Sequence, residues 1–297
     1  MKDIYAYGLV ELSSIYTLNG LFPVADSYKE VDQLIELPGG EATNAVVVLS
    51  RLGLKTIIAG TWLGKDVYYK IQNYLKSEKV DTSALELKPN YSGPKDLVFV
   101  STEGRTIFGW FGKLWFHGRK WSTPKEQHIK NCKVAVIDPF MLKESERAAQ
   151  LCVKHNKPYV TIDEKPSLYI VQNSTAVVIS NEFILREYPN ANIAKLFASY
   201  TDKCKGLVVF TFGADHIIYG RKGKKPVTYK PIKIKAVDTL GAGDTFRAGI
   251  AYGLLKGFDD DKNIKFSSNF AAMICLAGPG VTKSPNLKQL NKYIKNI

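Results

Sequence analysis

The order of apolar and polar residues along the chain predicts strands that alternate with helices. Short apolar runs, typical of buried strands, occur at Ile4 to Val10 and at 56–60, 134–137, 159–162, 176–179 and 207–211. Stretches with the helical spacing of apolar residues lie at 41–52, 65–77, 143–155, 192–203, 242–256 and 261–277. This alternation is typical of a largely parallel sheet covered by helices on both faces. The chain shows no internal repeat or linker, which favours a single domain over residues 1–297.

Two segments depart from this alternation. Residues 13–37 and 96–116 mix polar and apolar positions in the way that exposed antiparallel strands do. The second segment contains the aromatic passage Phe108-Gly-Trp-Phe-Gly-Lys-Leu-Trp-Phe116. Bare strand edges and large apolar patches invite partners. We therefore expect these aromatic side chains to pack within the strands or against a second copy of the chain, rather than to stack on a ligand.

The most informative stretch joins an expected strand, Ile232 to Val237, to a helix. It reads Asp238-Thr-Leu-Gly-Ala-Gly-Asp-Thr-Phe-Arg-Ala-Gly249. Small residues at 241–243 allow backbone N–H groups to converge at the start of the helix, where the positive end of the helix dipole favours an anion. Asp244 adds a carboxylate there, which suits a phosphoryl transferase because it can orient a hydroxyl and accept its proton. The alternative is a tight turn in which Asp244 only satisfies the helix terminus.

A second run of glycines opens another expected helix. Gly39 and Gly40 precede Glu41-Ala-Thr-Asn44, and an apolar helix follows. Glycines permit a polyol to approach the backbone closely, and the Asn44 amide both donates and accepts hydrogen bonds. Taken alone, this pattern is also compatible with ordinary initiation of a helix.

The two runs resemble the signatures of the ribokinase-like (PfkB) family of carbohydrate kinases, which read G-G-x-x-x-N and D-T-x-G-A-G-D-x-F. Every fixed position of the second signature is present, and the two runs lie about 200 residues apart in the expected order. Thr211-Phe-Gly213 is similar to the family's T-x-G element, and the resemblance extends from Gly8 to about Gly280. A dinucleotide-binding fingerprint fits poorly, because its third glycine would fall on Phe246.

The resemblance implies a three-layer α/β/α sandwich with a mainly parallel central sheet and a small β-sheet lid, built from about residues 12–37 and 94–117. It implies ATP and Mg²⁺, with a monovalent cation as a further candidate. Asp244 would be the catalytic base, and Gly241, Ala242 and Gly243 would form the anion hole. The implied substrate contacts are Gly39, Gly40, Glu41, Asn44, Ser13 and Arg105. The implied nucleotide contacts are Thr211, Gly213, Asn181 and Asn269.

Two positions depart from the family pattern. The family's first strand usually ends in G-x-x-x-x-D, whereas counting from Gly8 gives Ser13, so that carboxylate is missing or is supplied by Glu11 or Glu41. The family's N-x-x-E element, linked to magnesium and phosphate, ends here in Ile184.

The metal ligands therefore stay unassigned. We expect ATP phosphates and water to hold Mg²⁺, helped by an acid such as Glu182. The ketohexokinase branch of the family also departs from N-x-x-E, and residues 104–107 and 163–166 are similar to that branch.

The composition limits the expected cellular location and the kinds of partner. No apolar run approaches the length of a membrane-spanning helix, and the first residues lack the features of a signal peptide, so we expect a cytoplasmic protein without membrane contact. The 4 cysteines are scattered without metal-site spacing. The net charge of +13 favours anionic ligands, but no nucleic-acid-binding motif accompanies it, so we expect no nucleic-acid partner.

These features favour an ATP-dependent sugar kinase that forms a homodimer through its lid. A ketose such as fructose is the first candidate acceptor, while ribose, 2-keto-3-deoxygluconate and a nucleoside such as adenosine stay open. A non-catalytic sugar or nucleotide sensor with the kinase fold is the alternative from a different class. The absence of carboxylates at positions 13 and 184 favours the sensor, and the intact run at 241–244 argues against it more strongly.

Overall fold

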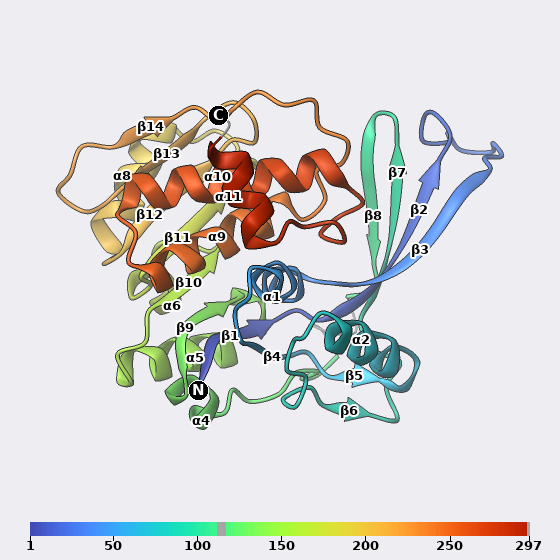
Figure 1. The fold of residues 1–297 in the computed structure, drawn as a ribbon, viewed down its shortest axis with the longest axis horizontal. Helices are drawn as coiled ribbons and strands as arrows, with labels where there is room; N and C mark the ends of the chain where they lie inside the picture. The colour runs from blue at the N-terminus through green and yellow to red at the C-terminus, as the bar shows by residue number, and fades with distance from the viewer. Residues whose placement is uncertain (112–116, 296–297) are drawn as a thin grey trace.

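The computed structural model describes residues 1–111 and 117–295. Its central sheet has 8 strands in the order β14-β13-β12-β11-β10-β9-β1-β4 (Figure 1). Neighbouring strands run parallel from β4 to β12, and β13 and β14 form an antiparallel extension. The bounds are β1 (Lys2–Gly8), β4 (Thr56–Gly60), β9 (Cys132–Ile137), β10 (Tyr159–Ile162), β11 (Ala176–Ser180), β12 (Leu207–Thr211), β13 (Ile217–Gly220) and β14 (Val227–Tyr229). The largely parallel sheet predicted from the sequence is confirmed.

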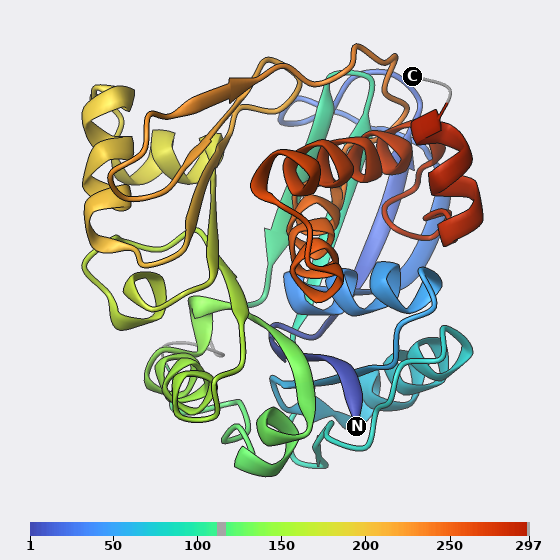
Figure 2. The ribbon, with the colours of Figure 1, turned by 60° about the vertical axis from the view of Figure 1, so that its left-hand side comes forward.

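Helices cover both faces of this sheet (Figure 2). One face carries α1 (Glu41–Arg51), α2 (Lys65–Ser77), α9 (Ala242–Lys256), α10 (Asp260–Ala277) and α11 (Leu287–Lys295). The other carries α4 (Glu126–Lys130), α5 (Lys143–Lys154), α6 (Tyr169–Gln172), α7 (Asn181–Glu187) and α8 (Ile193–Lys203). Successive strand residues point to opposite faces, so Ile4 packs in one core and Tyr5 in the other. None of the described helices combines the length and apolar character needed to cross a membrane.

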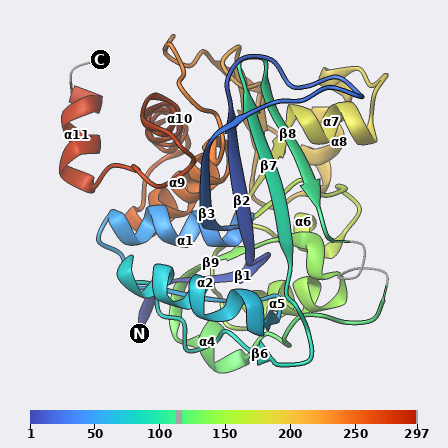
Figure 3. The same cartoon turned by 90° about the vertical axis from the view of Figure 1, so that its right-hand side faces the viewer.

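A second sheet of 4 strands projects from this body, in the order β3-β2-β7-β8 (Figures 1 and 3). Its strands are β2 (Glu11–Leu18), β3 (Val31–Gly39), β7 (Lys95–Ser101) and β8 (Gly104–Gly109). The separate small sheet is confirmed, but β2 and β7 run parallel rather than antiparallel. The reason is their connection: α1, β4 and α2 lie between them in the chain, so no hairpin fixes their direction. Residues 112–116 of the aromatic passage lie outside the described residues.

Aromatic side chains pack together on the second sheet. The ring of Phe99 stacks on that of Tyr16, with centroids 5.0 Å apart, and lies edge-on to Phe22 and Phe108, each at 5.8 Å. Offset and edge-on pairs of this kind add to the stabilisation from burial. The expectation that these aromatic side chains pack within the strands is therefore confirmed for Phe108.

The strand predicted at Ile232 to Val237 is wrong. This segment is irregular up to the start of α9, although its alternating Ile and Lys residues match a strand pattern. The N–H groups of Val237 and Asp238 donate to the carbonyl oxygen of Cys275 in α10, at 2.7 and 3.2 Å. Backbone groups that a strand would pair with a neighbour are thus satisfied by the end of a helix.

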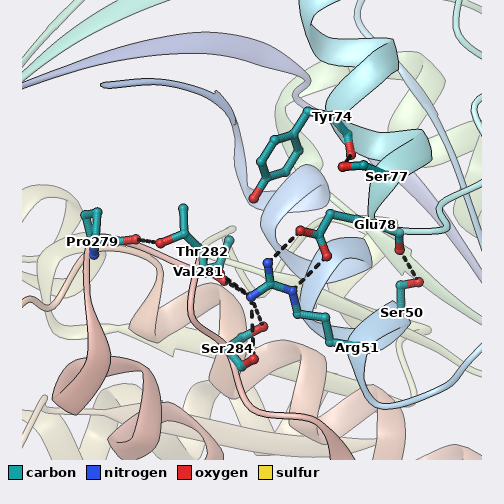
Figure 4. Close-up of polar contacts among 9 residues, drawn as sticks. All are labelled: Ser50, Arg51, Tyr74, Ser77, Glu78, Pro279, Val281, Thr282 and Ser284. Carbon is teal, nitrogen blue, oxygen red and sulfur yellow. Dashed lines mark hydrogen bonds and ion pairs between the residues drawn. The ribbon is translucent and has the colours of Figure 1, made fainter. Parts of the chain in front are cut away.

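Arg51, the last residue of α1, ties that helix to the loop that follows α10 (Figure 4). Its guanidinium donates two hydrogen bonds to the Glu78 carboxylate, at 2.8 and 2.6 Å. Its Nη1 also donates to the carbonyl oxygens of Val281 and Thr282 and, at 3.2 Å, to the hydroxyl of Ser284. The planar guanidinium suits this forked arrangement. Arg51 therefore holds the loop against α1.

Candidate functional site

A cavity of about 320 Å³ lies at the carboxyl ends of β10, β11 and β12. Ile162, Ser180 and Thr211 line it from the ends of these strands, and residues of β2, β3, β7 and β8 close its other side. The carboxyl ends of parallel strands are where open α/β sheets bind their ligands. The volume also falls in the range of small-molecule sites, about 300–1,000 Å³. The second sheet therefore forms one wall of a candidate binding site.

The two glycine runs meet in this cavity. Asn44 Nδ2 donates a hydrogen bond of 2.7 Å to Asp244 Oδ2, and both side chains line the cavity. Asp244 stands in the first turn of α9, as the sequence predicts. The contact joins residues that are 200 positions apart in the chain.

The start of α9 has the conformation that its glycines allow. Gly241 caps the helix in the left-handed region, with φ of 77°. A Cβ at this position would lie only 2.8 Å from Cγ1 of Val281, so the close approach of the cavity-lining loop also requires glycine. Thr245 fixes the first turn, because its N–H and its hydroxyl both donate to the Gly241 carbonyl oxygen, at 2.9 and 2.8 Å.

The cavity brings together most of the predicted site residues. Ala242, Gly213 and Asn181 do not line it, although each lies within two residues of one that does. Asn269 lies elsewhere, in a second cavity between α9, α10 and α11. The predicted residues that line the first cavity are Ser13, Gly39, Gly40, Glu41, Asn44, Arg105, Thr211, Gly241, Gly243 and Asp244.

Carboxylates gather where β2 and β7 border the cavity. Glu11 and Glu41, the two acids considered as replacements for the carboxylate missing at position 13, both line it. The sequence analysis missed a third, Asp96 of β7, which hydrogen-bonds Ser13. Gly39 is needed for this packing, because a Cβ there would lie 2.2 Å from the Ser13 hydroxyl oxygen. Burial raises the pKa of Glu11 well above its usual value, and the nearby charges of Asp96, Glu41 and Asp244 raise it further.

A buried ion pair between Asp138 and Arg247 lies close to Glu41 and Asp244. Arg247 Nη1 lies 2.5 Å from Asp138 Oδ1, and both side chains are fully buried. Asp138 Oδ2 accepts from the backbone N–H of Leu9 at 2.9 Å and of Ala42 at 3.1 Å, which ties the pair to the start of α1. Burial opposes the charge on Arg247, but the carboxylates of Asp138 and Asp244 outweigh it and raise its pKa.

The sequence analysis missed this pair, although it contains one signal. Arg247 is the only charged residue between Asp244 and Lys256 in an otherwise apolar helix. A buried charge of this kind needs a partner, but the sequence does not show which one.

The described residues include no group of three or more His, Cys, Asp or Glu side chains placed to hold a metal ion. Ile184, which stands where the family has Glu, is buried in the core. Glu182 lines the cavity and is exposed to solvent. Mg²⁺ keeps several waters and takes few protein ligands, so a cavity with Glu182 at its border is compatible with a metal held mainly by phosphates.

Comparison with known proteins decides between the families that such a cavity could serve. The model of the pfkB family of carbohydrate kinases matches residues 1–286. This chain belongs to the pfkB family. The predicted family, fold and kinase class are therefore confirmed.

Relatives of this pfkB kinase carry different names. A 5-dehydro-2-deoxygluconokinase from Clostridium botulinum is 26% identical over 287 residues, covering 86% of this chain and 84% of its own. A nucleoside kinase from Methanothermobacter thermautotrophicus is 25% identical, covering 92% and 89%. The solved structure of Arabidopsis thaliana ribokinase, complexed with ribose and ATP, has a TM-score of 0.81 at 16% identity and covers 99% of both chains. None of these names supports the fructokinase branch, which stays a prediction.

Proposed function

We propose that this pfkB kinase transfers the γ-phosphoryl group of ATP to a hydroxyl group of a sugar, with a ketose such as fructose as the first candidate. The observation that carries the proposal is the hydrogen bond between Asn44 and Asp244. This hydrogen bond joins residues 39–44, which suit a polyol, to residues 241–244, which suit an anion, within one cavity.

The residues suggest how the transfer proceeds. The acceptor lies against Gly39, Gly40 and Asn44, with one hydroxyl directed at the Asp244 carboxylate. The hydroxyl oxygen forms a bond to the γ-phosphorus, its proton passes to Asp244, and the bond from the γ-phosphorus to the bridging oxygen breaks to leave ADP. Backbone N–H groups at 241–243 and the dipole of α9 stabilise the negative charge that develops.

The nucleotide would lie along the ends of β11 and β12, near Asn181, Thr211 and Gly213. The role proposed for Asn269 requires the nucleotide to reach the second cavity, between α9 and α10. Mg²⁺, when bound, would neutralise charge on the phosphates, and Glu182, which lines the cavity, is the acid proposed to help hold it. A requirement for a monovalent cation and a cytoplasmic location stay predictions.

A nucleoside is the second candidate acceptor. The relative named nucleoside kinase covers more of this chain than the relative named for a gluconate does, 92% against 86%. Asp244 and the anion hole at residues 241–243 would serve both acceptors, because both reactions transfer a phosphoryl group to an alcohol.

The proposed activity is tested by following ADP formation with fructose, ribose, 2-keto-3-deoxygluconate and adenosine. We expect at least one acceptor to raise ADP formation to about 1–100 per second, the usual range for kinases. Acceptors that bind without promoting ADP formation would instead favour the sensor. If no acceptor binds or reacts, the proposed function is wrong.

We also propose that the second sheet acts as a lid and forms a homodimer contact. Ser13, Arg105 and Ile107 line the cavity from this sheet, while Phe108 and Trp110 are 50% and 62% exposed. Exposed apolar strands of this kind are usually covered by a partner. We expect light scattering at micromolar concentration to give twice the chain mass of 33.1 kDa. A monomeric mass would contradict this contact.

A further inference from the structure

The wall formed by β2, β7 and the start of α1 presents carboxyl oxygens that have no partner. Glu11 and Asp96 are only 5% and 6% exposed, and both line the cavity. Glu11 Oε2, Asp96 Oδ1 and Glu41 Oε2 are buried without a hydrogen bond from any described residue. Buried polar atoms are normally paired, and leaving one unpaired is costly. These three oxygens are therefore placed to meet hydrogen-bond donors of a ligand.

The described residues offer this wall one opposing buried charge, that of Arg247, which acts on Glu41. None of the three carboxylates takes part in an ion pair of the described residues. Arg247 forms its ion pair with Asp138 and not with any of the three carboxylates. Arg105 also lines the cavity, but its side chain is exposed, and its charge is not among the causes that shift the pKa of Glu11, Glu41 or Asp96.

The surroundings of the wall also disfavour the ionised form of its carboxyl groups. Burial raises the pKa of Glu11 and of Glu41 well above the usual value, and neighbouring carboxylates raise both further. Burial likewise raises the pKa of Asp96, although its hydrogen bond with Ser13 opposes the change. A further negative charge brought by a ligand would meet a like charge at each of these carboxyls that is ionised.

We propose that the acceptor of this kinase is an uncharged polyol whose hydroxyl groups donate to Glu11, Glu41 and Asp96, and that the site rejects acceptors bearing a carboxylate. This inference rests on the proposed function. A hydroxyl group can donate to a carboxylate and can accept from a protonated carboxyl, so it suits the wall in either state. A carboxylate only accepts, so it can pair only with a protonated carboxyl, and it is repelled by every one that is ionised. Fructose, ribose and adenosine remain as candidate acceptors, and 2-keto-3-deoxygluconate does not.

The test compares fructose with its two acids. In 2-ketogluconate the C1 alcohol of fructose is a carboxylate, and in fructuronate the C6 alcohol is, so one of them keeps the phosphorylated alcohol whichever end reacts. We expect kcat/KM for fructose to exceed that for either acid by about 100-fold or more. Calorimetry without ATP gives a second readout, in which only the neutral sugar should bind measurably. If ribose or adenosine is the best acceptor of the panel, the acids made by oxidising its own alcohols replace these two.

Variants of the wall show whether its charge causes the discrimination. Asp96→Asn and Glu11→Gln remove a buried charge but keep the shape, so both should fold. In each variant, kcat/KM for the acid should rise by about 10-fold or more relative to kcat/KM for the neutral acceptor. The affinity for the acid should rise by the same factor relative to that for the neutral acceptor. Glu36→Gln is the matched control, because Glu36 is an exposed acid of β3 in the same sheet, paired with Lys70 and outside the cavity.

The outcomes separate this inference from the function on which it rests. An acid that is phosphorylated as well as the best neutral acceptor, or bound as tightly, overturns the inference while the kinase activity stands. A preference for neutral acceptors that neither Asp96→Asn nor Glu11→Gln changes also overturns it. If no acceptor is phosphorylated, the proposed function fails, and the calorimetric comparison still decides whether the wall selects neutral ligands.

Discussion

Replacing Asp244 by asparagine is expected to lower turnover by about 10²–10⁴-fold and to leave the affinity for ATP nearly unchanged. The amide keeps the size of the side chain but cannot accept the proton of the acceptor hydroxyl. It also changes the contact with Asn44, whose Nδ2 lies 2.7 Å from a carboxylate oxygen. The first turn of α9 should persist, because Thr245 and the Gly241 carbonyl hold it independently. Steady-state kinetics on the best acceptor, with ATP binding measured by calorimetry, checks both parts.

Asp66→Asn is the matched control for this substitution. Asp66 also stands in the first turn of a helix, α2, but it is exposed and does not line the cavity. The control variant should keep normal turnover. Near-normal turnover of Asp244→Asn would remove Asp244 from the role of base.

Replacing Arg247 by methionine is expected to lower the free energy of unfolding by about 3–5 kcal/mol. The substitution leaves the Asp138 carboxylate in a fully buried position without its ion-pair partner, which lies 2.5 Å away in the intact protein. The N–H groups of Leu9 and Ala42 would still donate to Asp138, but they carry no net charge. Urea unfolding followed by circular dichroism measures the change.

Arg221→Met provides the comparison for a partly exposed pair. Arg221 forms two hydrogen bonds with Asp260, at 2.7 and 2.8 Å, and both side chains are 32% exposed. Its loss should cost less than about 1 kcal/mol, because water screens the exposed pair. Adding Asp138→Asn to Arg247→Met should recover part of the lost stability, since the uncompensated charge is then gone. Equal costs for the two Arg substitutions would show that burial does not set the importance of the Asp138–Arg247 pair.

The sequence predicted those site residues whose side-chain chemistry and place in the local pattern both indicate a ligand. The glycines at 39–40 and 241–243 stand at the starts of α1 and α9, where the sequence changes to the helical spacing of apolar residues. Asn44 and Asp244 follow at fixed distances, so both could be assigned before their contact was known. Asp96 could not, because nothing in the pattern of β7 shows that the strand lies beside β2 and turns this residue toward the cavity.

The wrong and missed predictions have one physical origin: local sequence patterns do not show which distant segments contact each other. Residues 232–237 alternate as a strand does, yet the end of α10 rather than a strand satisfies Val237. The parallel direction of β2 and β7 depends on the elements that lie between them. The Asp138–Arg247 pair joins residues 109 positions apart, and only the fold brings them together.

The most direct test of the central claim follows the phosphoryl group itself, with ATP labelled at the γ-phosphorus. We predict that the label appears on the acceptor and that ADP forms in equal amount, at a rate that Asp66→Asn leaves unchanged and Asp244→Asn lowers at least 100-fold. Label that appears only as inorganic phosphate, or transfer by Asp244→Asn at the rate of the unaltered protein, would contradict the account.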